Sequence, residues 1–459
     1  MMRNPLQLLC LLFILFSIRS RAQQPINFSL KQAFKLADQT YPGLAEREAR
    51  IGEYELRKQE AKSRSLPQIQ LQVQNSYGTF EGTNGAFFPV PGVFNVSGSS
   101  KHENNSIQAT GNTFGSVLMD WKFYEFGKQR KTIQAADYQL QGAKSSYEAS
   151  SLSLHAKVSR LYIDVQYSYA NLNWASKNVD RFKQILDLST SLTEAGLKPG
   201  ADTSISSSAY AQALALKDNW KGKYLASQIN LTEVVPFKQI SLPQPTLQVS
   251  FKNNLLKDSV VLSHPYLQVL DKQVLYEKAQ QAVVSSKILP SLSILGGLAT
   301  RGSGINSNGN IENGIGSGYQ NYANNYLIGV GLIWNIGNAY TSSLERKRAQ
   351  KTIQGAQSRY DLQKLQMNIA LGAVSAQIDQ QVQLLHHSEM ALKKATEAYE
   401  SYLTRYESGL INLTDLLQIQ SLLQLAEKEQ LQAAQTFWNL LITQAELSGD
   451  FTNVINQFN

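Results

Sequence analysis

The sequence predicts a mostly α-helical fold in which long coiled-coil hairpins are combined with four β-strands of the transmembrane barrel type. Three observations lead to this prediction: an internal repeat, heptad spacing of apolar residues along proline-free segments, and short segments that alternate apolar with polar residues. The chain has 459 residues, of which 42% are apolar and 17% are charged. This composition is typical of a large folded body rather than of a disordered chain.

The internal repeat is clearest at two glycine-centred breaks between long helical patterns, in residues 192–206 and 405–420. Upstream proline breaks repeat at an offset of 223, as in Pro67 and Pro290, so the length difference falls in the strand-loop-strand segment. We therefore predict a first repeat at 23–235, an equatorial linker at 236–262, a second repeat at 263–448 and a tail at 449–459. The corresponding residues of the two breaks are separated by 213 positions: Gly196 and Gly409, Leu197 and Leu410, and Asp202 and Asp415.

The N-terminal segment, residues 1–22, is predicted to be a secretory signal peptide. Arg3 precedes an apolar run at 8–16, and Ser20 and Ala22 provide small residues at the positions that a signal peptidase reads. A membrane anchor is less favoured because the run is shorter than the roughly 20 residues that span a bilayer. The only cysteine, Cys10, leaves with the signal, which predicts a mature chain without disulfides or thiolate metal sites.

The first repeat begins with two helical patterns that are followed by a strand. Ser29 is the expected N-cap of a short helix at 28–37, and a second helix is expected at 43–65. In residues 67–75, Ile69, Leu71 and Val73 alternate with glutamines, so the apolar side chains share one face of a strand. This pattern suits a barrel strand with lipid on one side and a water-filled lumen on the other, while a sheet in a soluble sandwich is the alternative.

A return strand is expected at about 107–121, after a loop at 78–106 that is rich in Gly, Asn, Ser and Pro. Aromatic residues follow this strand, and its counterpart in the second repeat ends in the same way. Such clusters are typical of a membrane-interface girdle, although they also occur in ordinary protein cores. The predicted interface aromatics are Trp121, Phe123, Tyr124 and Trp334.

The segment 128–195 contains no proline and predicts a helix about 100 Å long, which is rare in globular proteins. Apolar residues recur in it at every seventh position, which predicts coiled-coil packing with a left-handed supercoil. The second repeat is expected to contain strands at 291–295 and up to Trp334, on either side of a loop at 302–318. Its heptad positions match those of the first repeat: Val158, Val165, Leu172, Val179, Leu186 and Thr193 correspond to Leu371, Ile378, Leu385, Leu392, Tyr399 and Tyr406.

Four strands in one chain cannot close a barrel. An open sheet edge in lipid leaves backbone groups unsatisfied, at a cost of several kcal/mol for each group. If the strands span a membrane, the chains must therefore associate. Two chains would provide eight strands and a barrel filled by side chains, whereas three chains would provide twelve strands and a lumen.

These features together resemble the TolC-type outer-membrane efflux protein family. The resemblance rests on the segment 29–37 with Tyr41 and Pro42, the second element at Pro265, the tandem strand pairs and the two Gly-Leu hairpins. It implies a homotrimeric α/β-barrel tunnel in the outer membrane, with helices that extend into the periplasm. It also implies a passive exit duct for small molecules or polypeptides, in contact with outer-membrane lipid. Expected partners are a periplasmic adaptor (membrane fusion protein) and an inner-membrane pump of an efflux or type I secretion system.

The same resemblance suggests which residues form the periplasmic entrance. Asp415 matches one of two acidic rings, while Gln418 replaces the second and Ile411 replaces an arginine that would pair with Asp202. Lys198 is a candidate substitute for that arginine. Alternatively, Asp415 is only the N-cap of the following helix. The hairpin tips resemble adaptor-docking sites, although glycine there also serves to end a helix: Gly196, Leu197, Gly409 and Leu410.

We expect no enzymatic activity, cofactor or metal site, because no acid, base, nucleophile or metal-ligand set converges in the sequence. His386 and His387 are adjacent and diverge by about 100° on a helix, so they do not have zinc-helix spacing. Nucleic-acid binding is also disfavoured, because no basic run contains interleaved aromatic residues. The alternative to a channel is a periplasmic coiled-coil adaptor or structural protein, for which a single hairpin flanked by small β domains would be expected.

Overall fold

The computed structural model describes residues 29–79, 108–236 and 260–457. The predicted signal peptide, nearly all of the predicted loop at 78–106 and most of the predicted linker lie outside these ranges. The chain divides into two compact units, each of which draws on both repeats. A helical unit comprises Met1–Arg47, Tyr147–Pro265 and Gln363–Asn459, and a sheet unit comprises Glu48–Ser146 and Tyr266–Leu362.

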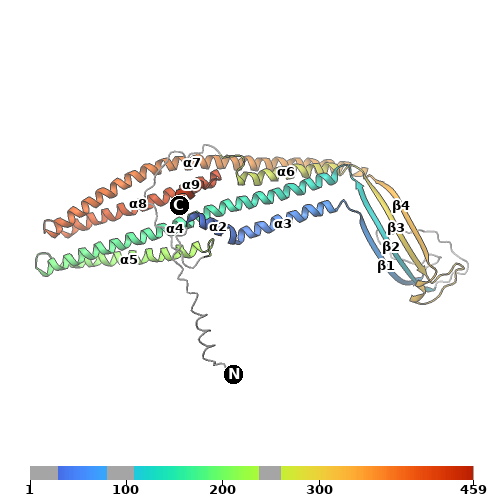
Figure 1. Cartoon of the computed structure of the whole chain (residues 1–459), viewed down its shortest axis with the longest axis horizontal. Coiled ribbons are helices and arrows are strands. Elements are labelled where there is room, and N and C mark those ends of the chain that lie inside the picture. Colours follow the sequence, from blue (N-terminus) through green and yellow to red (C-terminus); the bar gives the residue numbers. More distant parts are fainter. Residues whose placement is uncertain (1–28, 80–107, 237–259, 458–459) are drawn as a thin grey trace, which may run out of the picture. The chain divides into compact units, whose positions relative to one another are not determined.

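Two series of elements follow one another in the same order, except that α2 has no counterpart among the described residues of the second series (Figure 1). The first series is α2 (Leu30–Thr40), α3 (Pro42–Ser63), β1 (Gln68–Thr79), β2 (Ala109–Tyr124), α4 (Lys128–Glu194) and α5 (Gly200–Leu231). The second series is α6 (Pro265–Ser286), β3 (Ser291–Ser303), β4 (Ala323–Ile333), α7 (Ala339–Glu407) and α8 (Leu413–Ser448). The 3-10 turns η1 (Ile315–Tyr319) and η2 (Ile336–Asn338) flank β4, and α9 (Thr452–Gln457) follows α8.

The sheet unit contains one antiparallel sheet with the strand order β1-β2-β3-β4, so β1 and β4 are its edges. Strand β3 continues to Ser303, beyond the predicted end at 295 and into the segment predicted as a loop. The rest of the predicted loop contains a turn and then η1. The prediction of four strands is confirmed for the described residues.

The two faces of the sheet differ in polarity most clearly in two adjacent rows near its middle, where the registers align similar residues across all four strands. Leu71, Val117, Leu298 and Tyr326 form one such row, and they are 72%, 38%, 62% and 79% exposed. The adjacent row, on the opposite face, consists of Gln72, Ser116, Ala299 and Asn325. A soluble sandwich would cover the apolar face with a second layer, whereas the apolar face here is uncovered within the unit.

The helical unit has a core to which α4, α5, α7 and α8 all contribute. Ile185 from α4, Tyr406 from α7 and Leu416 from α8 are fully buried in it. Every predicted heptad position in the two long helices is buried or half-buried, including Leu371 and Ile378 at 1% and 0% exposure. The seven-residue spacing therefore identifies the packed stripe of both helices.

The predicted N-cap of the first helix is also confirmed. The Ser29 hydroxyl accepts a hydrogen bond from the Gln32 N–H, and the Gln32 side chain accepts one from the Ser29 N–H. This capping box satisfies two backbone donors that the first turn of α2 would otherwise leave without partners.

Candidate functional site

Two hairpin tips, one between α4 and α5 and one between α7 and α8, close with the same backbone turn. Gly196 and Gly409 have φ angles of +71° and +74°, a left-handed conformation that glycine adopts without the strain of a Cβ. In both turns the glycine N–H donates to the carbonyl three residues back, and the next N–H donates to the carbonyl five residues back, over 2.9–3.0 Å. This pair of hydrogen bonds is the Schellman motif, so the repeat extends to the backbone of the tips.

The leucines that follow these glycines extend into solvent. Leu197 is 69% exposed and Leu410 is 75% exposed. In a Schellman motif the residue at this position commonly contacts the preceding helical turn, which neither leucine does to any large extent. Two exposed leucines at equivalent tips are compatible with an adaptor contact, which stays a prediction.

Asp415 is not the N-cap of α8, so that alternative is wrong. Asn412 is the cap, because its Oδ1 accepts a hydrogen bond from the Asp415 N–H over 2.9 Å. Asp415 instead lies in the first turn of α8, where a negative charge is favourable next to the helix N-terminus. Its side chain is half-buried, and Gln418 is exposed one turn further on.

The structure connects the two tips through Lys198 rather than through Asp202. Lys198 Nζ donates to the carbonyl oxygen of Ile411 over 3.0 Å. These two residues are 213 positions apart, so they occupy equivalent places in the two repeats. Within the described ranges Lys198 makes no ion pair with Asp202, which lies in the first turn of α5. The lysine thus links the tips to each other, but through a backbone acceptor.

Tyr406 lies beneath this link and is fully buried. The Lys198 ammonium lies 5.6 Å from the centre of its ring. Burial raises the pKa of the Tyr406 hydroxyl, and the nearby charge of Asp202 raises it further. The structure therefore brings together Lys198, Ile411, Asp202 and Tyr406 at one end of the helical unit.

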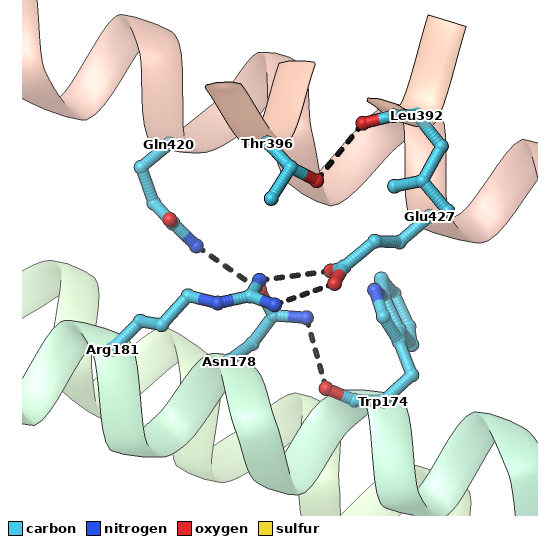
Figure 2. Close-up of polar contacts among 7 residues, drawn as sticks. All are labelled: Trp174, Asn178, Arg181, Leu392, Thr396, Gln420 and Glu427. Atoms are coloured by element: carbon cyan, nitrogen blue, oxygen red, sulfur yellow. Dashed lines mark hydrogen bonds and ion pairs between the residues drawn. The ribbon is translucent and has the colours of Figure 1, made fainter. Parts of the chain in front are cut away.

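An ion pair deeper in the helical unit was not predicted from the sequence. The Arg181 guanidinium on α4 donates to both carboxylate oxygens of Glu427 on α8, over 2.8 and 2.5 Å (Figure 2). The two side chains are only 20% and 16% exposed. Burial acts to lower the pKa of Arg181, but the hydrogen bonds and charge of Glu427 outweigh it and hold the pKa above its usual value.

Amides extend this ion pair into a network that crosses from α4 to α8. Asn178 donates to the Trp174 carbonyl and accepts from Gln420 Nε2, both over 3.0 Å (Figure 2). Gln420 is fully buried, and this bond satisfies its Nε2 and the Asn178 Oδ1, whereas the Gln420 Oε1 has no hydrogen-bond partner among the described residues. The network fixes the register of α8 against α4 about two to four turns below the tip.

In the sheet unit, the two predicted interface tryptophans have a structural role. Trp121 Nε1 donates to the Ser65 carbonyl over 2.8 Å, and Trp334 Nε1 donates to the Ile288 carbonyl over 2.9 Å. Both carbonyls lie just beyond the end of a helix, where backbone acceptors have no helical partner. Each indole therefore joins the end of a strand to the helix that precedes the sheet. Phe123 and Tyr124 are 43% and 49% exposed at the same end.

A second group of exposed aromatic residues lies at the other end of the sheet and was missed in the sequence. These residues come from β1 and the segment that connects β3 to β4, and Tyr319 accepts a hydrogen bond from Asn75 over 3.1 Å. The sequence signal for them is the tyrosine content of that segment, just before the alternating pattern of β4. The group consists of Tyr77, Tyr319 and Tyr322.

The described residues contain neither a metal-binding cluster nor a membrane-spanning helix. No cluster of three or more His, Cys, Asp or Glu side chains within them could hold a metal ion. In the same ranges, no helix combines the length and the hydropathy that a bilayer crossing requires.

A family model and several solved structures are similar to this chain over most of its length. The family model described as "Outer membrane efflux protein" matches residues 34–235 and 257–448. Among solved structures, the outer membrane protein VceC from Vibrio cholerae is similar with a TM-score of 0.73 at 15% identity, covering 92% of this chain and 96% of VceC. The Campylobacter jejuni CmeC outer membrane channel has a TM-score of 0.71 at 15% identity, with coverage of 93% and 88%.

The open state of the Neisseria gonorrhoeae MtrE outer membrane channel has a TM-score of 0.71 at 14% identity, and the match covers 94% of each chain. At these identities the structural matches establish a shared fold. No curated protein sequence matches the chain.

Proposed function

Because the chain belongs to the outer membrane efflux protein family, we propose that it is an outer-membrane channel that serves as a passive exit duct. It works as a homotrimer, with the sheet in the outer membrane and the helices in the periplasm. A periplasmic adaptor and an energised inner-membrane pump connect to it in a tripartite efflux or type I secretion system. The cargo consists of small molecules or polypeptides, and the chain itself catalyses no reaction.

The observation that carries this proposal is the open four-stranded sheet with one apolar, uncovered face. Ile69, Val73 and Val330 on that face are each more than 70% exposed. In water such a face favours aggregation, while in lipid it is stable only if the free edges of β1 and β4 are paired. Three copies provide twelve strands, which pair all edges and leave a lumen. The face that contains Gln72, opposite the apolar face, lines this lumen.

The aromatic residues at the two ends of the sheet support this placement. Tyr77 pairs with Gly111, which is ten residues before Trp121, so the two aromatics are about 34 Å apart along an extended strand. A strand tilted by about 40° then spans roughly 26 Å of bilayer, close to the apolar band of about 25 Å in outer-membrane barrels. Both predicted and newly found aromatics thus lie where interfacial girdles occur.

The hairpin tips are proposed to form the periplasmic entrance. Three copies of Asp415 around a trimer axis attract cations, while Gln418 adds no charge at the next turn. The familiar pairing of Asp202 with an arginine is replaced by the bond between Lys198 and the Ile411 carbonyl. We propose that this bond holds the two tips in a closed arrangement. Leu197 and Leu410 are proposed to contact the adaptor.

The adaptor alternative is not retained. The family match spans both repeats, and each repeat contributes a hairpin and a strand pair rather than one hairpin between separate β domains.

A charge placed on the two faces of β1 tests the proposal. Leu71→Arg puts a cation on the apolar face, where arginine in a lipid-exposed barrel position costs about 2–4 kcal/mol, while Gln72→Arg puts it on the lumen face of the same strand. We expect heat-modifiable trimer in the outer-membrane fraction for the wild type and Gln72→Arg, and strongly reduced trimer for Leu71→Arg. Recovery of the wild type as a soluble periplasmic monomer, or equal behaviour of both variants, would contradict the proposal.

A further inference from the structure

Helix α7 begins directly after the sheet, and one of its sides carries an aromatic residue, then an aliphatic residue and then two cationic residues. Tyr340, Leu344, Lys347 and Lys351 are spaced by four, three and four residues, so they lie along one side of the helix. Tyr340 is 75% exposed, Leu344 is 48% exposed, and both lysines are exposed. We call these four residues the α7 basic face.

The charge on this face is not neutralised by the protein. In the described part of the chain, Lys347 and Lys351 form no ion pair, and Lys351 donates only to the Gln354 side chain. By contrast, Lys287 in the same unit pairs with Glu345 over 2.9 Å.

The side chains of these lysines are expected to lean toward the sheet. Helical side chains lean toward the N-terminus of their helix, and the N-terminus of α7 is the end that follows β4. At about 1.5 Å per residue, Lys347 starts about 10 Å from Tyr340 and Lys351 about 16 Å from it. A lysine or arginine whose stem lies along apolar surface can extend its charge toward an interface.

From this arrangement we propose that the α7 basic face binds the headgroups of anionic phospholipids in the periplasmic leaflet. The proposal rests on the proposed function, because it requires the sheet to span the membrane. Tyr340 and Leu344 then continue the aromatic end of the sheet into the interface, and the cations follow at headgroup depth. Anionic phospholipid fits because exposed cations next to an anionic surface bind it through charge complementarity.

The first repeat does not contain an equivalent face. The positions 213 residues earlier hold Gly127, Lys131, Gln134 and Tyr138. Of these, only Lys131 is cationic, and its ammonium already donates to Ser286 Oγ over 2.8 Å. The corresponding positions of the first repeat therefore do not form such a face, and a trimer has three copies of the α7 basic face.

The test uses full-length trimer in phosphatidylethanolamine nanodiscs that contain either pyrene-labelled phosphatidylglycerol or pyrene-labelled phosphatidylcholine. Energy transfer from tryptophan, including Trp334 at the same end of the sheet, reports how close each probe is held. We expect higher transfer to the anionic probe, and a loss of that preference in 1 M salt, where the Debye length falls to about 3 Å.

Charge-removing variants locate the contact. Lys347→Gln is expected to reduce the preference by up to about fivefold, since one cation near an anionic surface contributes about 1 kcal/mol, and Lys351→Gln by less. Arg359→Gln is the matched control, because this exposed arginine on α7 lies about 28 Å from Tyr340 and should leave the preference unchanged.

Equal transfer to both probes, or the same loss in Arg359→Gln as in Lys347→Gln, would overturn the inference. These outcomes are distinguishable from failure of the proposed function. A trimer that inserts and conducts ions without preferring anionic lipid refutes only the lipid contact, whereas a chain that neither inserts nor conducts refutes the channel itself.

Discussion

The two hairpin tips share a backbone turn and differ in the side chains around it. Both close on a left-handed glycine with the same two hydrogen bonds. At the first tip α5 begins after Pro199, which makes no side-chain cap, whereas at the second tip Asn412 caps α8. At equivalent positions the first tip provides a cationic donor, Lys198, and the second provides its acceptor, the Ile411 carbonyl. The repeat thus preserved the turn, while the side chains diverged into complementary partners.

The largest expected effect is on thermal stability, and it concerns an ion pair below the tips that the two repeats do not share. Arg181 corresponds to Lys394 in the second repeat, but Arg181 is buried against Glu427, while the Lys394 side chain is 75% exposed. Arg181→Met should destabilise the protein by about 3–5 kcal/mol, because it leaves the Glu427 carboxylate buried and unpaired. Thermal unfolding followed by circular dichroism measures this loss.

Two further variants control this prediction. Lys394→Met should leave the melting temperature unchanged, because its ion pair with Glu397 is solvent-exposed. Replacing both members of the buried pair, as Arg181→Met with Glu427→Leu, should restore most of the lost stability. Equal destabilisation by Arg181→Met and Lys394→Met would show that the two repeats have not diverged in this respect.

The shared turn predicts equal costs at the two glycines. A Cβ at Gly196 or Gly409 would meet no atom within 4 Å, so the cost of alanine is that of the left-handed backbone alone, about 1–2 kcal/mol. Gly196→Ala and Gly409→Ala should therefore lower thermal stability to the same extent. A clear difference between them would mean that the tips differ in backbone strain as well as in side chains.

Substitutions at the N-caps of α8 and α5 are expected to change stability by smaller and unequal amounts. Asn412→Ala should cost about 1 kcal/mol, because the Asp415 N–H loses its acceptor, and Asn412→Ser should be nearly neutral. At the first tip Pro199→Ala removes no side-chain cap and is expected to be close to neutral. Hydrogen exchange of the first-turn amides of α8 and α5 compares the two ends directly.

The smallest expected effect is on ion selectivity. Asp415→Asn should reduce the cation preference of the channel severalfold in planar bilayers, since it removes three charges from the proposed ring at once. Gln418→Ala, one turn further along α8, removes no charge and should retain the preference. Unchanged selectivity in Asp415→Asn would leave Asp415 only with a role at the helix N-terminus.

The sequence predicts the elements well because their signals are local. Heptads mark the buried stripes of α4 and α7, alternation marks β1, and glycine marks both turns, since each pattern reflects the geometry of a few neighbouring residues. The end of β3 was placed too early because its last residues, such as Gly302, resemble a loop in composition. The alternative role of Asp415 as the cap of α8 is wrong because Asn412, an equally suitable residue type three positions earlier, makes the cap.

The contacts of the candidate site were less predictable because they depend on tertiary register. Arg181 and Glu427 are 246 positions apart, and nothing in either heptad pattern indicates which turns of α4 and α8 face each other. Lys198 binds a backbone carbonyl, which leaves no sequence signal in its partner. The basic face of α7 can be seen in the sequence, but its meaning depends on which end of the helix adjoins the sheet.

Single-channel conductance of the purified trimer in planar bilayers tests the central claim most directly, with wild type compared to Lys198→Met. The account predicts that the wild type forms a cation-selective pore that is mostly closed. Loss of the bond to the Ile411 carbonyl should increase its open fraction without changing the trimer content. Absence of conductance in both proteins would contradict the assignment as a channel, and identical open fractions would contradict the link between the tips.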